Sequence, residues 1–126
     1  MNRSLLLAAG CAGLLLALPL VAVGDDDPAM IVSGKLVDHQ GMTLYTFDKD
    51  DIGKSNCNGQ CAANWPPLAA SAGAEGNEDW TVVTRDDGSL QWAYYGRPLY
   101  TFVQDKQPGD TTGDGKMDVW HIAKPQ

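Results

Sequence analysis

The sequence has little positive charge. Nine lysine and arginine residues stand against sixteen aspartate and glutamate residues in a chain of 126, which gives a formal net charge of −7. No cluster of basic residues interrupts this balance at any point along the chain. Because phosphate groups are bound by clustered Lys and Arg side chains, the composition argues against nucleic acid and anionic membrane surfaces as partners.

Cysteine and histidine are scarce as well, with three and two residues respectively. Neither histidine stands near a nucleophile in a recognisable catalytic pattern, and the chain has no glycine-rich phosphate loop. Beyond residue 30 the apolar residues show no helical period. These absences predict a protein that is not an enzyme and that is not built from helices.

The N-terminus indicates export. Arg3 precedes an almost unbroken apolar run over residues 5–23, and small residues lead to Gly24 before three aspartates. This order is typical of a secretory signal peptide, here residues 1–24. The run also approaches the roughly 20 residues of a membrane-spanning helix, but Pro19 and the cleavage site favour removal.

A second alternative is lipid attachment at Cys11, as in a bacterial lipoprotein. The apolar stretch before it, residues 5–9, is shorter than the roughly 7–15 residues expected there. We therefore predict a periplasmic or extracellular protein that contacts the membrane only if Cys11 is lipidated. Residues 25–33 are interpreted as a flexible leader, and residues 34–126 as one domain.

An internal duplication dominates the rest of the chain. The decamer at residues 41–50 returns at residues 96–105, with glycine, Leu-Tyr-Thr-Phe and the final aspartate in common. The same ungapped shift carries Trp65 onto Trp120. A duplicated half usually cannot close its own core, so the two repeats, about 34–80 and 81–126, are expected to pack as one unit.

The predicted fold class is all-β. Short apolar segments alternate with Gly, Asp, Asn and Pro, which favours strands; the candidates are residues 30–37, 43–47, 80–85, 90–95, 99–103 and 119–123. A helical turn is expected only at residues 61–65. We predict two tandem repeats that form small antiparallel meanders and pack as one compact barrel or sandwich, with the aromatic residues in its core.

The paired motifs are specific enough to suggest a family. Tyr45 and Asp50 in the first repeat, and Tyr100 and Asp105 in the second, resemble the bacterial secreted repeat family known by its Tyr-x4-Asp motif, whose members are often labelled lipoproteins. The segments 57–67 and 109–115 are also similar to it. The resemblance implies export and an all-β repeat, and it implies no established activity.

With the signal peptide removed, Cys57 and Cys61 are the only cysteines. An even pair in an oxidising compartment predicts a disulfide, and the intervening Asn-Gly lets the chain turn back sharply. The alternative is a thiol redox pair. However, three residues separate the cysteines and their neighbours are uncharged, which does not suit an activated thiol.

The second repeat contains a candidate metal loop. Its residues match positions 1, 3, 5, 6 and 9 of an EF-hand calcium loop, in the order Asp110, Thr112, Asp114, Gly115 and Asp118. His121 takes position 12, where a bidentate carboxylate is expected, and a solvated acidic turn explains the same residues. Copper is a further alternative, since thioether and imidazole ligands remain at Met30, Met42, Met117, His39 and His121.

Taken together, the sequence predicts an exported, non-enzymatic binding or structural module of the bacterial cell envelope, without a cofactor. Its partner would be another envelope protein or a small ligand. Calcium or copper binding and thiol redox chemistry are the two alternatives from other functional classes.

Overall fold

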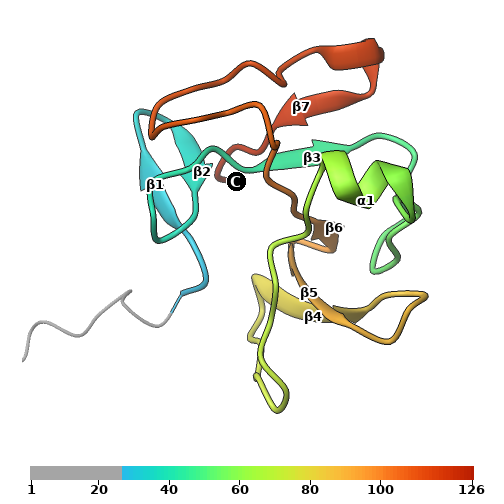
Figure 1. Ribbon diagram of the computed structural model, residues 1–126. Coiled ribbons are helices and arrows are strands. Elements are labelled where there is room, and N and C mark those ends of the chain that lie inside the picture. The colour runs from blue at the N-terminus through green and yellow to red at the C-terminus, as the bar shows by residue number, and fades with distance from the viewer. Residues whose placement is uncertain (1–26) are drawn as a thin grey trace, which may run out of the picture.

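A computed structural model describes residues 27–126 (Figure 1). The predicted signal peptide, its predicted cleavage point after Gly24 and the candidate lipidation site at Cys11 lie outside these residues. Among the residues described, no helix is long and apolar enough to cross a membrane.

The secondary structure consists of short strands with very little helix, as the sequence predicts. Three antiparallel sheets are present: β1–β2, β3–β7 and β4–β5–β6. The helix α1 covers the predicted helical turn. The elements are β1 Met30–Val32, β2 Lys35–Val37, β3 Tyr45–Phe47, α1 Gln60–Asn64, β4 Trp80–Thr84, β5 Leu90–Tyr94, β6 Arg97–Pro98, the 3-10 helix η2 Lys116–Asp118 and β7 Trp120–Ile122. The sheets pack in a sandwich-like way and do not close into a barrel.

The segment predicted as one strand over residues 30–37 is a hairpin. Ser33 and Gly34 both have positive φ, 52° and 79°, and reverse the chain between β1 and β2. Met30 pairs with Val37 as a result. The prediction was wrong because this tight turn lies inside an apolar run. The hairpin also places residues 30–32, which we had assigned to the leader, in a paired strand.

Residues 99–103 do not form the predicted regular strand, and the reason is their partner. Thr101 and Val103 donate backbone hydrogen bonds to the carbonyl oxygens of Pro66 and Asn64, at 2.8 and 3.0 Å. The partner segment contains Pro66 and Pro67, and proline has no N–H to return. The segments therefore lie side by side with an incomplete ladder, and only the β-bridge between Pro67 and Tyr100 is formed.

Pairing between the repeats is the main topological feature. Each repeat supplies a local antiparallel unit, β1–β2 in the first and β4–β5–β6 in the second. The central segments instead cross over: β3 of the first repeat pairs with β7 of the second, and Figure 1 shows these strands side by side although they are far apart in sequence. Segment 99–103 of the second repeat lies in the same way on residues 64–67 of the first. The β3–β7 sheet therefore needs both repeats.

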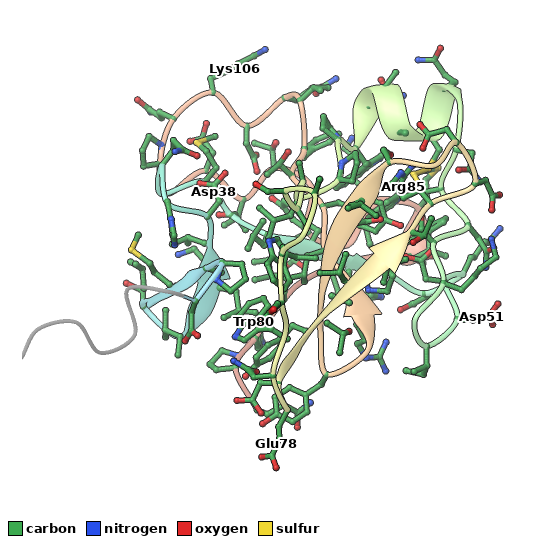
Figure 2. All side chains as sticks on the ribbon, turned by 90° about the horizontal axis from the view of Figure 1, so that it is seen from below. Asp38, Asp51, Glu78, Trp80, Arg85 and Lys106 are labelled. Carbon is green, nitrogen blue, oxygen red and sulfur yellow. A yellow bond between two sulfur atoms is a disulfide. The ribbon has the colours of Figure 1, made fainter. Side chains whose placement is uncertain are left out.

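The alternation of side chains along the repeat strands divides the core in two. Leu44 and Leu99 point into a leucine cluster, completed by Ala29, Leu36, Trp80 and Ala123. Their neighbours Tyr45 and Tyr100 point to the other face, into an aromatic cluster with Cys57, Trp65, Phe102 and Trp120. In Figure 2, Trp80 and Arg85 mark opposite ends of the β4 region, whereas Glu78 and Lys106 extend outward.

Candidate functional site

Equivalent residues of the two repeats meet at the centre of the aromatic cluster. Tyr45 and Tyr100 exchange both backbone hydrogen bonds, at 2.8 and 3.0 Å between nitrogen and oxygen. Trp65 and Trp120 stack on each other, with ring centroids 3.8 Å apart and planes only 3° apart. Because each residue meets its own counterpart, the two repeats are related by a local pseudo-two-fold axis.

The stack continues on both sides of the tryptophan pair. Phe47 packs on Trp120 with a centroid distance of 4.2 Å, and Phe102 packs on Trp65 at 4.0 Å. Four rings therefore form one column in the order Phe47, Trp120, Trp65, Phe102. Each stacked pair contributes about 0.5–1.5 kcal/mol beyond the burial of its surface. Residues of the first and second repeat alternate along this column, so both repeats are needed to form it.

The motif tyrosines and aspartates pair across the repeats. The Tyr45 hydroxyl donates a hydrogen bond to Oδ2 of Asp105, and the Tyr100 hydroxyl donates one to Oδ2 of Asp50, both at 2.7 Å. In each pair the tyrosine belongs to one repeat and the aspartate to the other. The tyrosine and aspartate of one Tyr-x4-Asp motif thus bind the aspartate and tyrosine of the other motif. The spacing within one repeat does not predict this exchange.

The second oxygen of each carboxylate holds the loop that follows its own strand. Oδ1 of Asp50 accepts the backbone N–H of Asn56 at 2.7 Å. Oδ1 of Asp105 accepts both the backbone N–H and the hydroxyl of Thr112, at 2.9 and 2.6 Å. Each aspartate therefore ties a loop to the tyrosine of the opposite repeat.

A buried arginine extends this network on one side only. Arg85 is 5% exposed and donates to Oγ of Ser55, Oε1 of Gln91 and the carbonyl of Cys57, at 2.9, 2.8 and 2.6 Å. Ser55 in turn lies 2.7 Å from the Tyr100 hydroxyl. The sequence carried no signal for this arrangement, since Arg85 is a single cation that ends a strand pattern.

The carboxyl group of Asp50 lies at the end of that network. Burial raises the pKa of Asp50 above its ordinary value, while hydrogen bonds from Asn56 and Tyr100 and the charge of Arg85 oppose the rise. The hydrogen-bonded chain from Arg85 through Ser55 and Tyr100 to Asp50 is internally satisfied, so it holds the first loop rather than offering free groups for chemistry.

Alkaline pH is expected to destabilise the protein. Burial, reinforced by the carboxylate partners, raises the pKa of Tyr45 and Tyr100 above their ordinary value. Above pH 10 the unfolded chain has released phenol protons that the folded chain keeps, so the free energy of unfolding falls as the pH rises. Below that pH the stabilisation is complete. Urea unfolding at about pH 8 and about pH 11 measures the loss, and Tyr45→Phe should lose less. If the wild type and Tyr45→Phe lose the same free energy of unfolding between these pH values, Tyr45 is not a source of the pH dependence.

The predicted disulfide is confirmed. Cys57 and Cys61 are joined, with Cα atoms 5.2 Å apart. Cys57 lies just before α1 and is fully buried, while Cys61 lies within the helix and is half-buried. Cys57 and Thr112 occupy equivalent positions in the two repeats. The disulfide therefore constrains the first loop where the hydrogen bonds of Thr112 to Asp105 constrain the second.

Removing the disulfide with Cys57→Ala and Cys61→Ala together should lower the free energy of unfolding by about 2 kcal/mol, since so short a loop removes little entropy from the unfolded chain. Urea unfolding measures the difference. The folded, oxidised protein should also resist exchange with glutathione, because attack needs access to a sulfur atom. Rapid exchange in the folded state would instead favour the thiol redox alternative.

The candidate metal residues of the second loop are engaged in separate contacts. Asp110 accepts the backbone N–H of Lys106 at 2.8 Å, Asp114 that of Ile122 at 3.2 Å, and His121 lies 2.8 Å from Asp48. Thr112 is bound to Asp105, and Asp118 lies in η2. Within residues 27–126 no group of three or more His, Cys, Asp or Glu side chains is arranged to hold a metal ion. Calcium or copper binding stays a prediction for metal titration to test.

An apolar pocket opens beside the aromatic column. It has a volume of about 210 Å³ and lies between α1, η2 and the strands β3 and β7. Its lining residues are Phe47, Lys49, Cys61, Asn64, Trp65, Met117, Val119 and Trp120. Sequence analysis did not find it, because its walls come from four segments that only the crossed pairing brings together.

Comparison with known proteins agrees with the two-repeat organisation. Residues 33–69 and 81–124 match the profile of a family described as a secreted repeat of unknown function. No match was found among curated proteins or among solved structures.

Proposed function

Since this chain belongs to the family of secreted repeats of unknown function, we propose that it is an exported, non-enzymatic binding module of the bacterial cell envelope. Its binding element is the pocket between α1 and η2. The single observation that carries this proposal is a preformed apolar cavity walled by three rings of the aromatic column. Ligand pockets are typically concave, mostly apolar and lined by aromatic side chains with a few polar groups.

The motif residues support a scaffold role for the core of the repeats. Both tyrosines and both aspartates are used in the reciprocal hydrogen bonds that join the repeats. A rigid framework of this kind positions surface loops, and binding residues commonly lie on such loops. The pocket residues Asn64 and Met117 lie in such connections between strands. Asn64 is at the end of the short helix α1, and Met117 is in the 3-10 helix η2.

Indole N–H resonances offer a direct test. The chain has four tryptophans; Trp65 and Trp120 line the pocket, whereas Trp80 and Trp92 belong to the leucine cluster. A library of small aromatic compounds added to the ¹⁵N-labelled mature protein should contain members that shift the Trp65 or Trp120 signal and leave the other two in place. If no compound moves either pocket signal, the proposal fails.

The place of the protein in the envelope is a separate part of the proposal. We propose a soluble mature form that begins at Asp25, and the intact mass of protein recovered from a bacterial periplasm tests this. A mass increased by a lipid group on Cys11 would show instead that the module is tethered to the membrane.

A further inference from the structure

The size of the pocket limits its ligand. Its volume of about 210 Å³ lies below the roughly 300–1,000 Å³ of sites for drug-sized molecules. The lining includes the aromatic residues Phe47, Trp65 and Trp120, together with Met117 and Cys61. Aromatic rings and sulfur atoms both pack favourably on a planar apolar group. A ligand with one or two fused rings suits these walls.

The charge of the pocket is opposite to that of the protein. The chain has a net charge of −7, yet the lining residues include one cation, Lys49, and no acidic side chain. Lys49 is exposed, and among the residues described its ammonium group takes part in no ion pair. The acidic neighbours have other partners: Asp48 pairs with His121, and Asp50 with Tyr100. The cation is thus available to an anionic ligand.

Two further observations single out this region. Met117 and Asp118 are consecutive non-glycine residues with positive φ, 52° and 60°, and the Met117 side chain is 75% exposed. Such backbone conformations cost free energy and occur most often at binding and catalytic sites. The Trp120 indole nitrogen is the one buried side-chain nitrogen or oxygen without a hydrogen-bond partner among residues 27–126. Buried polar groups are normally paired, so this unpaired donor distinguishes Trp120 from the rest of the core.

From these features we infer that the pocket binds a small planar aromatic carboxylate. The apolar rings of the ligand pack against the aromatic wall, and its carboxylate pairs with Lys49, with the amide of Asn64 as a second polar contact. This inference rests on the proposed function, since it names the ligand class of the same pocket.

The experiment compares 2-naphthoate with 2-naphthamide, which has the same rings and no charge. Both are titrated into the ¹⁵N-labelled mature protein while the four indole N–H signals are followed. Naphthoate should shift the Trp65 and Trp120 signals and bind about fivefold more tightly than naphthamide, the ratio expected of one exposed ion pair. Lys49→Gln should remove this difference by weakening naphthoate about fivefold and leaving naphthamide unchanged.

The matched control is Lys124→Gln, which removes the same charge from a residue that lines a different cavity. It should leave both affinities unchanged, and constant Trp80 and Trp92 signals show that each variant is folded. Equal binding of the two compounds would overturn the carboxylate inference and leave the proposed function standing. If Lys49→Gln and Lys124→Gln weaken naphthoate binding equally, the attraction is a general effect of charge, and the carboxylate inference is overturned too. If neither compound nor any other aromatic compound shifts a pocket signal, the proposed function itself fails.

Discussion

Replacing Trp120 by alanine is expected to lower the free energy of unfolding by about 3–5 kcal/mol. Trp120 is fully buried and stacks on Phe47 and Trp65 at the same time. Its loss interrupts the column at an inner position and leaves a cavity that short strands are poorly able to close. A domain of this size has about 5–15 kcal/mol of stability in total, so the variant should unfold at much lower urea concentration.

Ile31→Ala provides the control for this experiment. Ile31 is a large apolar residue that is 62% exposed, and truncating it should change stability by no more than about 0.5 kcal/mol. Trp65→Ala should resemble Trp120→Ala, because the two residues occupy equivalent positions in the stack. A loss of less than about 1 kcal/mol in both tryptophan variants would show that the column does not carry the core.

The second large effect concerns the reciprocal tyrosine–aspartate pairs. Asp105→Ala should lower the free energy of unfolding by about 2–3 kcal/mol, because it leaves one buried donor and two part-buried donors without an acceptor. The donors are the Tyr45 hydroxyl and the backbone and side chain of Thr112. A double-mutant cycle with Tyr45→Phe should give a coupling of about 1–2 kcal/mol between Tyr45 and Asp105.

The discriminating comparison lies within one repeat. Tyr45 and Asp50 belong to the same motif, but the Tyr45 hydroxyl and the Asp50 carboxylate share no hydrogen-bond partner. The effects of Tyr45→Phe and Asp50→Ala should therefore add to within about 0.5 kcal/mol. Strong coupling within the repeat, together with additivity between repeats, would contradict the crossed arrangement. Urea unfolding of the single and double variants gives all the required values.

Crossed pairing explains why the motif recurs as a pair. A tyrosine in one repeat finds its carboxylate only in the other, and each tryptophan stacks on its counterpart from the other repeat. A single repeat would expose an unpaired β3 edge and half of the aromatic column. We therefore expect that a single repeat cannot close its own core.

The all-β class, the duplication and the disulfide follow from the sequence alone, and so do the opposite directions of neighbouring side chains along a strand. These properties depend on local rules: strand alternation sends Leu44 and Tyr45 to opposite faces, and two neighbouring cysteines have no other partner in an oxidising compartment. Helix α1 was likewise predictable to within a residue, because the Asn-Gly turn and the following Cys-Ala-Ala-Asn leave few alternatives.

Which repeat supplies each partner could not be predicted from the sequence. The motif spacing is the same whether Tyr45 binds Asp50 or Asp105. The pairing of β3 with β7 depends on contacts between residues far apart in the sequence, such as Tyr45 and Ile122, which are 77 positions apart. The buried position of Arg85 and the pocket beside Trp120 follow from that choice. Both combine segments from different repeats, and no local pattern of side chains encodes how two equivalent halves exchange their strands.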